Sequence, residues 1–332
     1  MPEQPRSPIP IPLEESVETG IAPHGATGLE PVPGVAQAIA VEATPVHHGK
    51  RKIGIGAWIS IVWLAAITGS AILAPVLPIA PVNARYPEIV RKGPGTAGHI
   101  LGGDSIGHDL FSRLIWGARN SLTVGVCAVG IGFLIGGMLG LLAGYHRGRF
   151  ETVVVAILDI LLSFPALVLA LSLSIFLRGR VILGVQMTGL MTVILALGII
   201  AIPAIARIAR ASTLTWSQRE FVLAARAQGA KNRRIIFREV LPNVVPAMLS
   251  FAFLAVAIVI VAEAALSIIG AGIGPDKATW GNIINDGRGD LTTGEAPHIV
   301  FCASAVIFLT VMSLNYIGDT IRQRFDVRES AI

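Results

Sequence analysis

Long apolar stretches alternate with short polar or charged segments along most of the chain. A helix needs roughly 20 residues, at about 1.5 Å of rise each, to cross about 30 Å of hydrocarbon. Because a helix satisfies its own backbone hydrogen bonds, the pattern predicts an all-α integral membrane protein with six transmembrane helices. The predicted spans are residues 54–74, 121–144, 152–176, 181–206, 247–269 and 299–317.

The composition narrows the class of protein further. Of the 332 residues, 53% are apolar and 14% are charged. Soluble domains carry about 25% charged residues, so this chain has too few to cover a water-exposed surface. A soluble globular protein, a disordered chain and a secreted disulfide scaffold are therefore excluded. Cys127 and Cys302 lie in apolar stretches and do not indicate a redox compartment.

The first 49 residues differ from the rest, because they are rich in proline and glutamate and contain Arg6 as the only Lys or Arg. Such a segment buries too little apolar surface to fold, so we expect a disordered tail. It does not resemble a signal peptide, which starts with a basic stretch followed by an apolar one. The basic residues 50–52 then directly precede the first predicted span.

The distribution of Lys and Arg predicts the orientation in the membrane. If both termini are cytoplasmic, 17 of the 26 Lys and Arg residues lie on the inner side, as the positive-inside rule requires. Residues 1–49 and 326–332 are then cytoplasmic tails. Residues 50–119 hold the first span and an extracytoplasmic segment, and residues 120–325 hold five spans with a long cytoplasmic loop at 207–245.

The second predicted span carries glycines at four-residue spacing, which places them on one helix face. Such a face lets a neighbouring helix backbone approach closely. It is either a seam that slides when the bundle changes conformation or a static packing surface, and the sequence favours static packing. The four glycines are Gly132, Gly136, Gly140 and Gly144.

Two acidic residues lie inside predicted spans, and a charge within a bilayer is a functional candidate because its burial is costly. Asp159 lies in the third span, which is also interrupted by Pro165; it is either functional or a carboxylate favoured near a helix N-terminus. Glu263 lies in the fifth span, and we favour a hydrogen bond to a neighbouring helix. Neither belongs to a chain of acids and histidines that would indicate a proton relay.

The predicted loop at 207–245 is strongly basic and contains signals for two short helices. Ser217 and Glu220 fit a capping box, and Gly229 stands where a C-terminal glycine is expected. They delimit a predicted helix at 218–228 with Ala224 and Ala225 as a small-residue face. A second helix is expected at 233–241, ending before Pro242 because proline restricts the residue that precedes it.

This loop resembles the "EAA" loop of ABC importer permeases. The resemblance rests on the segment from Glu220 to Gly229, with its Ala224-Ala225 pair, followed by Leu241-Pro242-Asn243. The chain departs from the family pattern at Leu223 and Glu239, where the family has Glu and Ile. The resemblance implies that Ser217, Glu220, Ala224, Ala225, Gly229, Leu241 and Pro242 form a coupling loop that docks on a cytoplasmic ATPase subunit.

Two further segments resemble the dipeptide, oligopeptide and nickel branch of that family. One runs from residue 101 to 119, with Gly103 and His108 where relatives commonly have Thr and Arg, and the other from 263 to 281. In the first segment Leu110, Phe111, Leu114 and Ile115 share one helical face opposite Ser112 and Arg113, which predicts an interfacial helix. Gly270, Gly272 and Gly274 in the second segment predict a turn.

The resemblance implies a type I permease with both termini in the cytoplasm, in the bacterial plasma membrane. It also implies a second permease subunit, cytoplasmic ATP-binding subunits and an extracytoplasmic substrate-binding lipoprotein. The chain itself lacks the Gly-x-x-x-x-Gly-Lys-Ser/Thr motif that binds nucleotide phosphates. We therefore expect no catalytic residue, no metal, no bound cofactor and no nucleic-acid partner.

The sequence allows more than one cargo and more than one energy source. A dipeptide or oligopeptide is the favoured cargo, and nickel is the alternative within the family. His99 and His108 would then be candidate ligands, although no carboxylate or cysteine set accompanies them in the pattern. An ion-coupled secondary transporter predicts broken helices and inverted repeats, and a membrane scaffold would move no cargo.

Overall fold

The computed structural model describes residues 54–182 and 184–329, with side chains up to Arg324. The predicted tail at 1–49 and the basic residues 50–52 lie outside the described residues. At the other end, the last helix continues to Glu329, so residues 326–329 of the predicted tail are helical.

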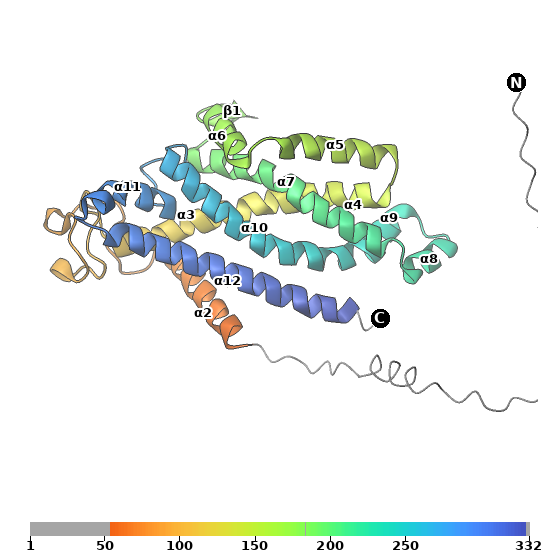
Figure 1. Cartoon of the computed structure of the whole chain (residues 1–332), viewed down its shortest axis with the longest axis horizontal. Coiled ribbons are helices and arrows are strands. Elements are labelled where there is room, and N and C mark those ends of the chain that lie inside the picture. Colours follow the sequence, from red (N-terminus) through yellow and green to blue (C-terminus); the bar gives the residue numbers. More distant parts are fainter. Residues whose placement is uncertain (1–53, 183, 330–332) are drawn as a thin grey trace, which may run out of the picture. The chain divides into compact units, whose positions relative to one another are not determined.

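The fold is a helical bundle, as predicted (Figure 1). In the part of the chain that the structure describes, five helical segments are long and apolar enough to cross a membrane, and a sixth span is formed if one bent pair is counted. The helices are α2 (Ile55–Leu73), α3 (Leu110–Ile131), α4 (Gly137–Tyr145), α5 (Arg149–Ser163), α6 (Ala166–Leu177), α7 (Gly189–Trp216), α8 (Glu220–Ala227), α9 (Asn232–Arg234), α10 (Leu241–Ile269), α11 (Trp280–Thr293) and α12 (His298–Glu329). Short 3-10 turns are η1 (Pro87–Ile89) and η2 (Thr96–Gly98).

The second span is longer than predicted, because α3 and α4 are joined through the π-helical turn η3 (Gly132–Gly136) into one segment of 36 residues. The predicted interfacial helix at residue 110 is therefore wrong, since it is the first part of α3. Asp109 caps this helix by accepting a hydrogen bond from the Ser112 backbone N–H at 2.6 Å. Ser112 and Arg113 are buried rather than facing water.

The third span is broken. Helices α5 and α6 meet at an angle of 88°. Phe164, which precedes Pro165, has an extended backbone, as expected for a residue whose helical conformation is disfavoured by the proline ring.

The fourth span begins later than predicted. The strands β1 (Val181–Ile182) and β2 (Val185–Gln186) pair antiparallel, and α7 starts at Gly189. Thr188 caps α7 by accepting a hydrogen bond from the Met191 N–H. Valine and isoleucine, which favour strands, are three of the four residues in β1 and β2, and this accounts for the later start of the helix.

The predicted stop before Pro242 is also wrong. The π-helical turn η4 (Ile235–Val240) leads directly into α10, and Pro242 lies in the first turn of α10, where a missing N–H is tolerated. The Asn243 side-chain amide donates to the Glu239 carbonyl at 2.6 Å, so the wider turn leaves that carbonyl satisfied. The segment from Asn232 to Ile269 thus counts as one long span.

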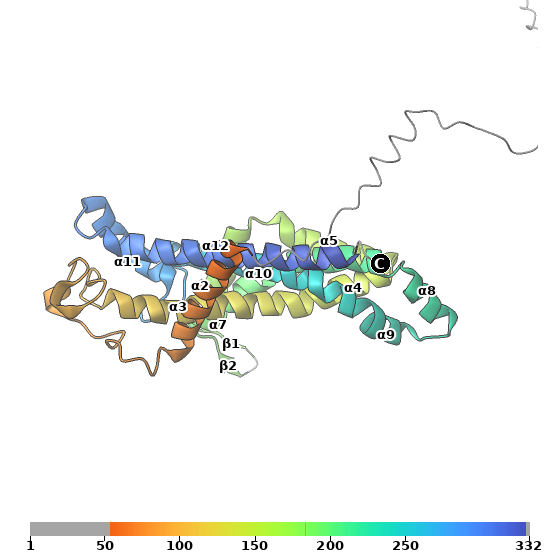
Figure 2. The ribbon, with the colours of Figure 1, turned by 90° about the horizontal axis from the view of Figure 1, so that it is seen from below.

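Helix α7 lies at the centre of the bundle and packs against α3, α4, α6 and α10. One apolar core cluster joins α3, α7 and α10 through residues such as Val124, Leu197 and Val259. A second cluster joins α2, α3, α11 and α12 around Trp280. Figure 2 shows α11 and the segment before α3 at one end of the bundle, and α8 and α9 at the other.

Candidate functional site

Helix α8 is anchored to the bundle by one side only. Val222 is fully buried and packs in the same apolar cluster as Ile235 and Ile236 of η4. Phe221, Leu223 and Ala224 are exposed. In Figure 1, α8 projects beyond the end of α7, so its outer side presents apolar and small residues beside Arg219 and Arg226.

The predicted capping box is wrong. Ser217 is the C-terminal cap of α7, and its hydroxyl donates to the Leu214 carbonyl at 3.3 Å. The residue before α8 is Arg219, which makes no side-chain cap, and Glu220 is the first helical residue. The reason is that α7 extends to Trp216 and uses Ser217 for its own end. The Arg219 guanidinium lies over the Trp216 ring at 5.3 Å.

The other end of α8 follows the sequence prediction. Gly229 has a φ of 79°, the left-handed conformation that glycine adopts without steric cost. The Ala230 N–H donates to the Ala225 carbonyl at 3.1 Å, a pattern typical of a glycine-terminated helix. Ala225 is half-buried, whereas Leu241 and Pro242 lie at the start of α10.

The four glycines of the second span lie against α7. A β carbon at residue 132 would come within 2.8 Å of the Ala201 β carbon, and one at residue 144 within 2.8 Å of the Arg210 carbonyl. Gly136 and Gly140 face the carbonyls of Ile202 and Ala206 even more closely. The glycines therefore allow direct contact between two helix backbones.

Two ion pairs lie beside this contact and join α5 to α7. Asp159 accepts a hydrogen bond from Arg207 at 2.6 Å, and Glu151 accepts one from the Arg210 Nε at 2.8 Å. The Asp159 and Arg207 side chains are 52% and 58% exposed. Sequence reasoning singled out Asp159 but missed Arg207, whose position at the boundary of a predicted span was the available signal.

Asp159, Arg207 and Arg210 line a cavity of about 300 Å³ between α4, α5 and α7. Its floor contains Gly140 and Ala143 of α4 and Ala206 of α7. Because these three residues have small side chains or none, they leave an open space next to the charged side chains. The cavity is thus lined by the carboxylate of Asp159 from α5 and by the guanidinium groups of Arg207 and Arg210 from α7.

Glu263 is fully buried between three helices. Its carboxylate accepts hydrogen bonds from Ser121 of α3 at 3.0 Å and Ser267 of α10 at 2.9 Å. The Ser121 hydroxyl in turn accepts the Trp280 N–H of α11 at 3.3 Å. Glu263 therefore joins α10 to α3 and α11, which is the arrangement of a residue that holds helices together.

A buried polar cluster lies at the end of the bundle opposite α8. Arg113 donates to Asp104 at 2.5 Å and to Asp286 of α11 at 3.3 Å, and His108 contacts Asp104 at 2.8 Å. Sequence reasoning included Asp104, His108 and Arg113 in a family motif without foreseeing this cluster. The motif places them within nine residues, but Asp286 comes from a helix that the sequence analysis did not predict.

The two carboxyl groups of this cluster differ in acidity. Burial raises the pKa of Asp104, but hydrogen bonds from the His108 backbone and from Arg113 outweigh it, so its pKa lies below the ordinary value. Burial also raises the pKa of Asp286, and the attraction to Arg113 does not offset it, so its pKa lies above the ordinary value. Arg113 therefore stabilises the ionised form of Asp104 more than that of Asp286.

The histidines considered as nickel ligands each have a carboxylate partner. His99 contacts Asp109 at 2.5 Å, and His108 contacts Asp104. Among the side chains that the structure describes, up to Arg324, no group of three or more His, Cys, Asp or Glu is placed to hold a metal ion.

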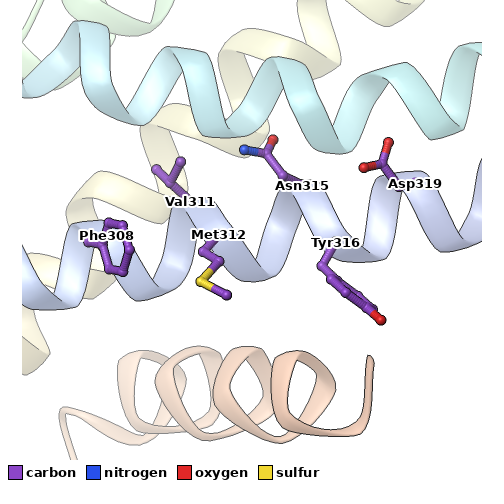
Figure 3. Close-up of a pocket in the computed structure, with 6 residues that line it drawn as sticks. All are labelled: Phe308, Val311, Met312, Asn315, Tyr316 and Asp319. Atoms are coloured by element: carbon purple, nitrogen blue, oxygen red, sulfur yellow. The ribbon is translucent and has the colours of Figure 1, made fainter. Parts of the chain in front are cut away.

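A second cavity, of about 370 Å³, lies along α12 (Figure 3). The side chains of Asn315 and Asp319 point toward α10, whereas Met312 and Tyr316 point toward α2. The Asn315 Oδ1 is buried and has no hydrogen-bond partner among the described residues. Tyr316 contacts the start of α2 closely, because a β carbon at Gly56 would meet its ring.

The comparison with known families is decisive. Residues 136–330, more than half of the chain, match the family described as binding-protein-dependent transport system inner membrane component. The chain belongs to this family. It is an ABC importer permease of the dipeptide and oligopeptide type, and it is a multi-pass protein of the bacterial plasma membrane.

Curated relatives include permeases of a glutathione transport system. The chain is 34% identical over 277 residues to glutathione transport system permease protein GsiD of Pectobacterium atrosepticum, covering 83% of this chain and 87% of the relative. It is 38% identical over 252 residues to GsiD of Escherichia coli, covering 75% and 79% of the two chains.

Solved structures show the same fold. Inward-facing structures of the MetNI methionine ABC transporter align with TM-scores of 0.53 and 0.55, at 25% and 24% identity. The alignments cover 64% and 65% of this chain and nearly all of the matched chains. The type I permease architecture expected from the sequence is thus confirmed.

Proposed function

We propose that this permease imports small peptides and that α8 is the element through which ATP hydrolysis on a separate subunit drives transport. The observation that carries the proposal is the construction of α8. It is held to the bundle by Val222 on one side, ends at Gly229, and exposes Phe221, Leu223 and Ala224 on the other. Exposed apolar residues at the tip of a bundle are typical of a protein interface.

The partners follow from this assignment. We propose that a cytoplasmic ATP-binding subunit covers the outer side of α8, with Glu220 and Arg226 at its rim. A second permease subunit completes the membrane part, and an extracytoplasmic lipoprotein delivers the cargo. Both termini are then cytoplasmic, and α11 with the Asp104 cluster faces the binding protein. ATP binds to the partner, so this chain needs no cofactor of its own.

The mechanism is a two-state switch. When the ATP-binding subunits close, α8 moves with them, and α7 follows because only Ser217, Gln218 and Arg219 separate the two helices. Helix α4 moves with α7, since their backbones are in direct contact at the glycines. The bundle thereby changes the side of the membrane to which its path is open.

A peptide is the cargo that the relatives favour, because the GsiD permeases are named for glutathione, which is itself a tripeptide. Nickel is the alternative cargo. An ion-coupled secondary transporter is the alternative mechanism, and the break between α5 and α6 is a feature that such transporters share.

The test is reconstitution of the complete complex in proteoliposomes with its binding protein. ATP-dependent uptake of labelled glutathione or a dipeptide is expected, and Ala224→Trp should abolish uptake by blocking the approach of the partner. Glu239→Gln, on the turn behind α8, is the matched control. Uptake that continues without hydrolysis, driven by an ion gradient, would contradict the proposal.

A further inference from the structure

Helix α5 has two exposed faces of different chemistry. Thr152, Ala156, Asp159 and Ser163 are spaced by four, three and four residues, so they share one face, and all are exposed. A second exposed face carries Val153, Ile157 and Ile160. The third side, with Val154 and Leu158, is buried against the bundle.

The apolar face of α5 can contact lipid chains, whereas contact of the polar face with lipid chains is unfavourable. Placing a charged side chain in the bilayer centre costs about 2.5 to 3.5 kcal/mol even on the lowest scales. The Asp159 and Arg207 side chains are each more than half exposed, so this chain does not shield them. The polar face therefore contacts water or a polar surface rather than hydrocarbon.

The unused hydrogen-bonding capacity of the pair favours water. One oxygen of Asp159 accepts one nitrogen of Arg207, and no other partner of either side chain is found among the described residues. A carboxylate accepts several hydrogen bonds and a guanidinium donates five. A dry protein interface would leave most of this capacity unsatisfied at high cost, whereas a hydrated surface satisfies it.

The cavity beneath the pair adds space for a small solute. It measures about 300 Å³ and is bordered by Asp159, Arg207 and Arg210, with Glu151 bonded to Arg210 at its edge. The lining holds one carboxylate, that of Asp159, and two guanidinium groups, of which that of Arg210 is already paired with Glu151. Asp159 and Arg207 therefore present one charge of each sign to the cavity. A cargo with one ammonium and one carboxylate group is the solute that matches such a lining.

We propose that the α5–α7 polar face, defined as Thr152, Ala156, Asp159, Ser163 and Arg207, lines the water-filled translocation path. There Asp159 faces the ammonium group and Arg207 the carboxylate group of a zwitterionic cargo in transit. This inference rests on the proposed import function, but its main test needs no cargo and does not measure uptake.

The first experiment measures the water accessibility of single cysteines in the complete transporter. Cys127 and Cys302 are replaced with alanine, and Ser163→Cys or Thr152→Cys is compared with Ile157→Cys or Val153→Cys on the apolar face of the same helix. The probe is a membrane-impermeant charged methanethiosulfonate. We expect the polar-face cysteines to react at least tenfold faster, and at a rate that changes when the complex is trapped with ATP and vanadate.

Equal slow reaction of both faces would place the polar face against lipid and overturn the proposal. Reaction that requires removal of the second permease subunit would assign the face to a subunit interface and overturn it equally. Failure of ATP-driven uptake, with the expected labelling pattern intact, would instead count against the proposed function alone.

The second experiment tests the cargo contact. Asp159→Asn and Arg207→Gln should each reduce uptake of labelled alanyl-alanine at least fivefold through a raised KM, while size-exclusion chromatography shows an assembled complex. Thr215→Ser, at an exposed position about two turns beyond Arg207 on α7, is the matched control. Unchanged KM in both variants would overturn the assignment of the pair to the cargo.

Discussion

Gly140 and the Ala206 carbonyl lie so close together that the structure leaves no room for a β carbon at residue 140. The obstacle is backbone, which cannot rotate away as a side chain can. The contact between α4 and α7 therefore depends on the absence of a side chain at this position, and on the same absence at Gly136.

Replacing Gly140 with leucine should separate α4 from α7. We expect a loss of at least about 1 to 3 kcal/mol, the cost of overpacking a well-packed site. Thermal unfolding of the purified complex in detergent measures it. Gly130→Leu is the control, because a β carbon at that position of α3 has no neighbour within 4 Å. Equal stability of the two variants would contradict the argument.

Replacing Gly229 with valine should strain the end of α8. A left-handed conformation costs a residue with a β carbon about 1 to 2 kcal/mol, and more when it is β-branched. We expect a substantial loss of uptake per ATP hydrolysed. Gly229→Asn is the control, since asparagine tolerates this conformation and should retain most of the activity. The expected loss comes from backbone strain and not from steric crowding, because no atom lies within 4 Å of a β carbon added at residue 229.

Removing one partner of the buried Arg113–Asp104 pair should be strongly destabilising. Arg113→Gln leaves the Asp104 carboxylate buried without its charge partner, a change that costs about 3 to 5 kcal/mol in comparable sites. Denaturation of the detergent-solubilised complex checks it. Arg91→Gln is the comparison, because Arg91 is half-exposed in its pair with Asp290 and should cost far less.

The same cluster predicts a pH dependence of opposite sign for its two carboxyl groups. The pKa of Asp104 is lower in the folded state than its ordinary 3.8, so its stabilisation is present above pH 3.8 and is lost as the pH falls through the folded value. The pKa of Asp286 is raised, so the stabilisation from its neutral form is lost as the pH rises through its folded value.

Asp286→Asn should therefore leave stability at pH 7 unchanged or slightly increased, whereas Asp104→Asn should decrease it and flatten the loss in acid. Thermal unfolding between pH 3 and pH 7 distinguishes the two. A larger loss at pH 7 for Asp286→Asn than for Asp104→Asn would show that the roles of the two carboxyl groups are reversed.

The spans were predictable because their apolar length is a local property, and so were the glycine face of the second span and the left-handed Gly229. The element ends were not. Ser217 fits an N-cap and a C-cap equally well, and only the continuation of α7 to Trp216 decides between them. Pro242 is a stop in an α-helix but is accommodated after a π turn.

The ion pairs were the least predictable part of the candidate sites. Asp159 and Arg207 are 48 residues apart, and Arg113 and Asp286 are 173 residues apart. No local pattern joins such residues, because their contact depends on how the helices pack. The 14-residue helix α11 was missed for a related reason. Its glycines and polar residues give no local helical pattern, and the helix is stabilised by the burial of Trp280 and Ile283.

The π turn η3 sets the rotation of α4 relative to α3 within the second span. A π turn accommodates one more residue than an α turn, and each residue of an α-helix rotates the chain by about 100°. If the turn instead became regular α-helix with all its residues retained, the extra residue would rotate the part of the span after Gly136 by about 100° relative to α3. Gly140 and Gly144 would then turn away from α7, and larger side chains would take their place, although no residue of the seam had itself been substituted.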